Sequence, residues 1–78
     1  MTKEAVYSKL EKILKEMKGK DFKVSPQLSV LDELADDSVE LMEFVVTVEE
    51  DFQIMIPDDV IDSFVTLDDV AVYISENK

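Results

Sequence analysis

The sequence lacks both residue types on which most covalent catalysis depends. It contains no cysteine and no histidine among its 78 residues. Without them no thiolate, disulfide or imidazole base is available, and only carboxylates and lysines remain as candidate catalysts. A chain this short also buries only a modest core. We therefore expect a single domain over residues 1–78, without a deep enzyme cleft.

Glycine, proline and long apolar runs are also scarce. The chain has one glycine and two prolines, while 46% of its residues are apolar. This composition predicts a folded, mostly helical domain rather than a disordered chain. The start is charged throughout and lacks the apolar core of a signal peptide, and no run approaches membrane-spanning length. We therefore expect a cytoplasmic protein.

Positive charge is confined to one part of the chain. The net charge is −11, and seven of the eight lysines lie between Lys3 and Lys23. Residues 24–77 contain fifteen acidic residues and no basic one. Such a field repels nucleic acid and anionic membranes and attracts basic surfaces in a salt-dependent way. We expect a basic protein partner, no nucleic-acid binding and no membrane insertion.

A first helix is predicted over residues 3–18. Apolar residues recur there at helical spacing, and charged residues fill the opposite face. Thr2 is the expected N-cap and Gly19 the expected stop. Residues 18–36 show no sustained period, so we expect a long loop held down by its apolar side chains.

Three more helices are expected in the second half. One begins near Ser38 and runs to about Phe52, and a short helix begins around Pro57, which the first turn of a helix tolerates. The last helix opens at Thr66, where a capping-box pattern stands. The sequence thus predicts an all-α four-helix bundle, with three main helices and one short helix.

The helix from Ser38 to Phe52 has two apolar faces. At 100° per residue, its core-facing stripe consists of Leu41, Val45, Val48 and Phe52, with Phe44 at the edge. A second apolar row consists of Val39, Met42 and Val46, beside Glu43, Thr47 and Glu50. Such a row, flanked by glutamates, predicts a docking strip for a partner protein. The alternative is an ordinary surface with scattered apolar side chains.

Ser38, at the start of this helix, admits several interpretations. Together with Asp37 it forms a common N-cap pattern. A self-activated nucleophile is disfavoured because no histidine can take its proton. Regulatory phosphorylation is disfavoured because Asp36, Asp37 and Glu40 would repel the phosphate.

Three aspartate pairs raise the question of a metal site. They are Asp36-Asp37, Asp58-Asp59 and Asp68-Asp69. Hard cations prefer clustered oxygen ligands, but no calcium-binding loop pattern is present. Each pair stands where a helix is expected to start, so interaction with the helix dipole is the favoured explanation. We expect no dedicated metal site, and weak divalent-cation binding stays open.

Four motifs in a fixed order indicate a family. They are Asp37-Ser38-Val39 leading into Glu43, then Glu49-Glu50-Asp51-Phe52, Ile56-Pro57-Asp58 and Tyr73-Ile74. In this the chain resembles the bacterial acyl carrier proteins of dissociated (type II) fatty-acid and polyketide systems. The resemblance covers nearly the whole chain and is strongest over residues 28–74.

The resemblance implies a carrier without catalytic activity of its own. Ser38, beside Asp37, would hold 4′-phosphopantetheine, transferred from coenzyme A by a phosphopantetheinyl transferase. The thiol of this arm would carry acyl groups as thioesters to acyl-processing enzymes, so the reactive group belongs to the cofactor. We expect such a carrier to be a monomer. The alternative function is an unmodified acidic helical interaction module, in which Ser38 only caps its helix.

The resemblance also implies two further sites. The partner footprint, which overlaps the docking strip, consists of Asp37, Val39, Glu40, Glu43, Val46, Glu49 and Glu50, and Met42 joins it from the helix geometry. The acyl pocket consists of Phe44, Val48, Ile56, Ile61, Phe64 and Val70.

The chain departs from the family pattern at two places. The family usually shows Leu-Gly-x-Asp-Ser-Leu, whereas Ala35 stands here in the place of the glycine. If that glycine takes a positive φ, we expect mild strain at Ala35. Ile61 and Phe64 are bulkier than the residues common near the acyl pocket. They imply a narrower pocket that favours short or polar cargo.

Overall fold

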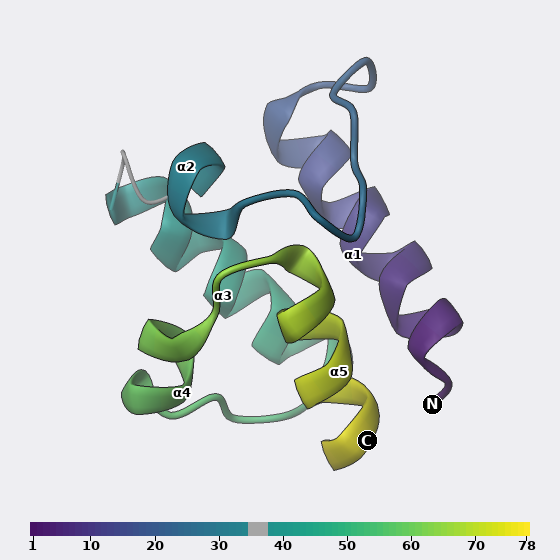
Figure 1. Cartoon of the computed structure of the whole chain (residues 1–78), viewed down its shortest axis with the longest axis vertical. Helices are drawn as coiled ribbons and strands as arrows, with labels where there is room; N and C mark the ends of the chain where they lie inside the picture. Colours follow the sequence, from purple (N-terminus) through teal and green to yellow (C-terminus); the bar gives the residue numbers. More distant parts are fainter. Residues whose placement is uncertain (35–37) are drawn as a thin grey trace.

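Three main helices frame the molecule, and two short helices complete it among the described residues (Figure 1). The computed structural model describes residues 1–34 and 38–78, and Ser38 only by its place in the backbone. The helices are α1 (Lys3–Lys18), α2 (Val30–Leu34), α3 (Ser38–Phe52), α4 (Asp58–Ser63) and α5 (Leu67–Asn77). The prediction of an all-α domain with three main helices is confirmed.

Both ends of α1 are capped as the sequence predicts. The Thr2 side chain accepts a hydrogen bond from the Ala5 backbone N–H (3.2 Å). At the other end Gly19 adopts φ 112°, a conformation that side chains rarely allow, and its N–H donates to the Lys15 carbonyl (2.9 Å). The chain therefore leaves the helix sharply after Lys18.

The core lies where α1 meets α3 and α5. Its fully buried side chains include Val6, Leu10 and Leu14 of α1, Val48 of α3, and Leu67, Val70, Ala71 and Ile74 of α5. Burying one large aliphatic side chain contributes roughly 1.5–3 kcal/mol, so these three faces supply most of the stabilisation. The predicted apolar face of α5 points into this core, and so do Val48 and Phe52 of α3, with Leu41 half-buried against it. The predicted stripe of α3 is shifted at one step, because Phe44 lies in the core cluster and Val45, although buried, lies outside it.

Helix α2 lies within the segment that the sequence predicts as a loop. The Ser29 side chain accepts a hydrogen bond from the Asp32 N–H (3.2 Å), and Val30 and Leu34 are buried. Five residues are too few to show a helical period, so the pattern of apolar residues did not reveal this helix. The long connection between α1 and α3 otherwise remains, with one short helix inside it.

The connection that precedes α2 pairs with the segment between α4 and α5. The Val30 N–H donates to the Val65 carbonyl, and the Leu67 N–H donates to the Leu28 carbonyl, both at 2.9 Å. The two segments thereby form an antiparallel bridge. This bridge fixes the start of α2 against the start of α5.

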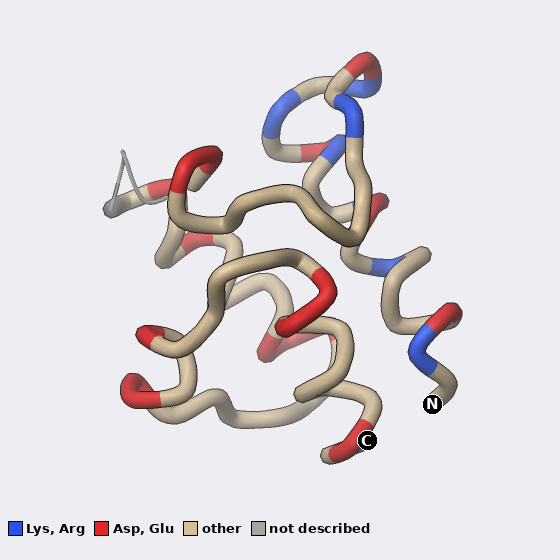
Figure 2. Tube along the Cα trace, viewed as in Figure 1, with Lys and Arg blue, Asp and Glu red and all other residues tan. Residues whose placement is uncertain are grey.

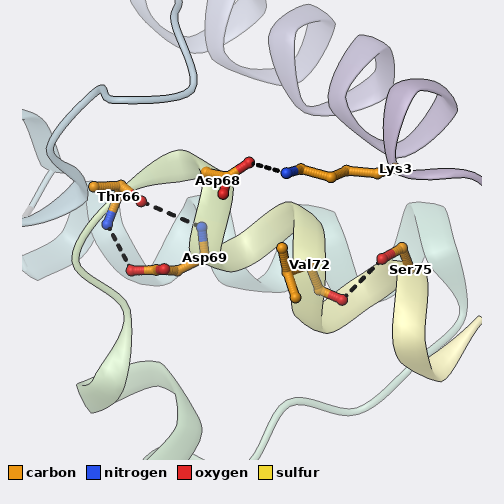
Figure 3. Close-up of polar contacts among 6 residues, drawn as sticks. All are labelled: Lys3, Thr66, Asp68, Asp69, Val72 and Ser75. Atoms are coloured by element: carbon orange, nitrogen blue, oxygen red, sulfur yellow. Dashed lines mark hydrogen bonds and ion pairs between the residues drawn. The ribbon is translucent and has the colours of Figure 1, made fainter.

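A capping box opens α5, as predicted (Figure 3). The Thr66 hydroxyl accepts from the Asp69 N–H (3.3 Å), and Asp69 Oδ2 accepts from the N–H groups of Thr66 and Val65, each at 3.0 Å. The hydrogen bonds from these two backbone N–H groups hold the pKa of Asp69 below its ordinary value, and the bond from Thr66 has the larger effect. The short helix α4 also begins near its predicted place, with Pro57 as N-cap.

Charge is segregated in space as it is in the sequence (Figure 2). Lysines and acidic residues alternate along α1 and the connection that follows it, whereas the other helices carry acidic residues and no lysine. None of the helices in the described part of the chain is long and apolar enough to cross a membrane.

Candidate functional site

Helix α3 begins at Ser38, where the sequence places its start. Asp37, Asp36 and Ala35 lie outside the described residues. The cap formed by Asp37 and Ser38 and the strain at Ala35 therefore stay predictions. Val39, the residue after Ser38, is 64% exposed, so this first turn of α3 lies at the surface.

An exposed apolar row follows Ser38 along α3. Val39, Met42 and Val46 are 64%, 51% and 45% exposed, and we call these three residues the outer row. Steps of three and four residues keep them on one side of a helix. The outer row lines a depression of about 560 Å³, whose other lining residues are Met17, Glu43 and Thr47. An apolar row of this size fits either a small docking strip or an ordinary surface, so its role in docking stays a prediction.

The glutamates of the predicted footprint differ in their surroundings. Glu43 and Glu50 are exposed, and the structure leaves their carboxylates at the surface. Glu40 is half-buried and pairs with Lys18, at the end of α1. This ion pair joins the first turn of α3 to the end of α1. Because its two residues are far apart in the sequence, local patterns do not predict it. Glu43 and Glu50 are thus the more accessible charges beside the outer row.

Glu49 bonds to the segment that follows its own helix. Its Oε2 accepts a hydrogen bond from the Ile56 N–H (2.8 Å), and its backbone carbonyl accepts from the Ile54 N–H (3.2 Å). The chain turns back at Gln53, which adopts φ 55°. This left-handed residue after the last helical turn, with the bond from Ile54 to Glu49, has the geometry of a Schellman helix end. Sequence spacing alone did not reveal the bond, because it depends on this turn.

The residues of the predicted acyl pocket are buried or half-buried in the structure. Phe44, Val48, Ile56, Phe64 and Val70 are buried, and Ile61 is half-buried against them. The Phe64 ring also packs edge-on against Tyr73, with ring centroids 6.0 Å apart. All six residues thus belong to the core or pack against it, and their grouping into a pocket that holds cargo stays a prediction.

Two of the three aspartate pairs lie at the helix starts at which the sequence places them. Asp58-Asp59 lies in the first turn of α4 and Asp68-Asp69 in that of α5, where Asp68 also pairs with Lys3 at 2.6 Å (Figure 3). Asp36-Asp37 lies outside the described residues. Within residues 1–34 and 38–78, no group of three or more potential ligands is placed to hold a metal ion.

Comparison with known families defines the class of this domain. Residues 5–74 match the family model described as "Phosphopantetheine attachment site". The match includes Ser38, the outer row and all three main helices in whole or in part. The chain is thus a phosphopantetheine-carrying domain.

Relatives narrow the class further. The chain is 36% identical over 73 residues to an acyl carrier protein of Bdellovibrio bacteriovorus, covering 92% of this chain and 94% of the relative. It is 35% identical over 72 residues to that of Karelsulcia muelleri (91% and 87%) and 41% identical over 56 residues to that of Zymomonas mobilis (72% of each). The chain belongs to the acyl carrier protein family. It is a non-catalytic carrier, and the resemblance noted in the sequence is confirmed.

The residues present fit the cofactor that this family carries. A serine hydroxyl is required for a phosphate ester, and Ser38 stands at the start of a fifteen-residue helix whose next residue is exposed. When bound, the arm supplies the thiol that this cysteine-free chain lacks. The chain's own residues hold the arm and present it to other proteins.

Proposed function

We propose that Ser38 is the residue that carries the phosphopantetheine arm. The observation that carries this proposal is the position of Ser38 at the first residue of α3, inside the matched segment and beside the exposed Val39. A transferase can therefore approach this turn from solvent. The N-terminal end of a helix also favours a phosphate, because its N–H groups are unsatisfied and its dipole is positive there.

The docking surface is the outer row together with Glu43 and Glu50. Its apolar residues line the depression on α3, and its carboxylates stand exposed beside it. The net charge of −11 steers basic surfaces toward it. The partners are a phosphopantetheinyl transferase of the holo-carrier synthase type and acyl-processing enzymes with basic docking patches.

The cargo is a short or polar acyl group in fatty-acid, polyketide or related metabolism. Ile61 and Phe64 support this choice, because both are large side chains that lie in the core or pack against it. Loading the arm with acetyl, hexanoyl and octanoyl groups tests it. Core resonances that shift with chain length, together with a rising melting temperature, would contradict the narrow pocket. The single domain, the monomeric state and the cytoplasmic location stay predictions.

Intact-mass measurement tests the attachment site. The purified chain is incubated with coenzyme A and a broad-specificity phosphopantetheinyl transferase, and the mass of one phosphopantetheine is expected to be added. Ser38→Ala is expected to gain nothing, whereas the matched control Ser63→Ala, at the end of α4, gains one arm. An unmodified wild-type chain would favour the interaction module over the carrier.

A further inference from the structure

Helix α4 depends on residues outside itself for its place in the fold. None of its own residues is fully buried, and Val60 and Ile61 are only half-buried. The residues that flank it, Ile56 and Phe64, are each 6% exposed and belong to the core. Helix α4 lies on the side of the molecule away from α1 (Figure 1). It is therefore anchored mainly through the two buried side chains that flank it.

A carboxylate from a neighbouring helix binds the backbone beside each of these anchors. On the α3 side, Glu49 Oε2 accepts from the N–H of Ile56 itself (2.8 Å). On the α5 side, Asp69 Oδ2 accepts from the N–H of Val65, the residue after Phe64 (3.0 Å). Hydrogen bonds to an ionised acceptor are stronger than those between neutral groups. The two ends of the α4 segment are thus fastened in the same chemical way, by different helices.

Glu49 is held within the domain, whereas its neighbour Glu50 is not buried. The Glu49 side chain is half-buried and bonded to Ile56, whereas Glu50 is exposed. The backbone carbonyl of Glu49 also accepts from Ile54, so one residue holds the turn at Gln53 at two points. A glutamate that served only as a docking charge would have no need of this geometry.

We propose that Glu49 and Asp69 clamp the two ends of α4 and so keep Ile56 and Phe64 seated in the core. The clamp keeps the region beside α4 closed to long acyl chains. This consequence rests on the proposed acyl pocket, whereas the clamp itself rests on the hydrogen bonds. Glu49 is thereby a positioning residue that acts through Ile56, and its role is separable from electrostatic docking.

Three variants of the phosphopantetheine-loaded protein separate the clamp from a docking charge. Glu49→Ala removes the acceptor, Glu49→Gln removes the charge but keeps a side-chain oxygen that accepts, and Glu50→Ala is the matched control. The readout is hydrogen exchange of the Ile56 amide, followed by NMR. We expect exchange in Glu49→Ala to be faster by about tenfold or more, with Glu50→Ala unchanged and Glu49→Gln between Glu49→Ala and the wild type. Equal exchange in Glu49→Ala and Glu50→Ala would overturn the clamp.

Loading with octanoyl groups tests the consequence for cargo. We expect the methyl resonances of Val48 and Val70 to shift on octanoylation in Glu49→Ala, and not in Glu50→Ala or the wild type. No shift in Glu49→Ala, despite a freely exchanging Ile56 amide, would overturn the link to cargo. A shift already present in the wild type would contradict the proposed narrow pocket. The clamp would still be tested separately, by hydrogen exchange of the Ile56 amide.

Discussion

The two faces of α3 both carry apolar side chains, but those of one face are buried and those of the other are exposed. Phe44, Val48 and Phe52 are buried in the core, while Val39 and Met42 on the other side are exposed. The inner face contributes to stability because it leaves water on folding. The outer row keeps about half of its surface in water and gains less from folding, so its exposed apolar surface is available for a partner.

This difference separates two consequences of mutation within one helix. Substitutions on the inner face are expected to lower the free energy of unfolding, and substitutions on the outer row to lower the rate of loading by the transferase. Both faces belong to the helix that begins at Ser38. The inner face holds α3 in the fold, and α3 in turn sets the position of the proposed attachment site.

The largest effect is expected for Phe52→Ala. Phe52 is 2% exposed, and Lys9 Nζ lies 5.1 Å from its ring centroid. Its loss leaves a cavity and should cost about 3–5 kcal/mol, enough to unfold much of so small a domain. Met42→Ala on the outer row should stay within about 0.5 kcal/mol. Urea denaturation followed by circular dichroism measures both, and similar losses would contradict the division of α3 into two faces.

A charge reversal beside the outer row should slow loading without unfolding the protein. Glu43→Lys is expected to lower the rate constant of phosphopantetheine transfer about tenfold at low salt, because it removes attraction and adds repulsion. The gap should narrow as salt screens the charges. Glu76→Lys, near the end of α5, makes the same charge change at a distance and serves as control. Equal slowing by the two variants would show that only net charge matters.

Removing a helix cap should act on stability alone. Thr66→Ala deletes the hydroxyl that accepts from Asp69 N–H and should lower the free energy of unfolding by about 1 kcal/mol. Thermal melting measures this loss. The rate of transfer to Ser38 should remain that of the wild type, since the cap lies on α5, and slower transfer would argue against the separation of fold from docking.

A smaller effect concerns pH. The pKa of Asp69 is lower in the folded protein than its ordinary value of 3.8. Its carboxylate therefore stabilises the folded state fully at pH values above 3.8, and this stabilisation is lost as the pH falls through the lower pKa of the folded state. The advantage of the wild type over Asp69→Asn should therefore be constant from about pH 7 to 5 and shrink below about pH 4. Denaturation of both proteins across this range measures it, and an advantage that persists at the acid end would contradict the assignment.

The main helices and their caps were predictable because their signals are local. Thr2, Gly19 and Thr66 cap helices within three or four residues of themselves, and the period of α3 is complete within fifteen residues. The short helix α2 offered only one such signal, Ser29 three residues before Asp32, which is a cap pattern. Its buried Val30 and Leu34 are too few to show a period.

The differing roles of the glutamates on α3 could not be predicted in the same way. Glu40 pairs with Lys18 on another helix, and Glu49 reaches Ile56 only because the chain reverses at Gln53. Both contacts depend on tertiary structure. The family resemblance therefore groups these acids into one expected footprint, whereas the structure separates exposed charges from those engaged within the domain.

The most direct test of the account compares one substitution at two exposed valines. Val46 belongs to the outer row, and Val65, which is 54% exposed, lies between α4 and α5. Arginine at either position changes the charge equally and should leave the melting temperature near that of the wild type. The measurement is the second-order rate constant for phosphopantetheine transfer to Ser38. The account predicts a fall of about tenfold or more for Val46→Arg and none for Val65→Arg, and equal rates for the two variants would contradict it.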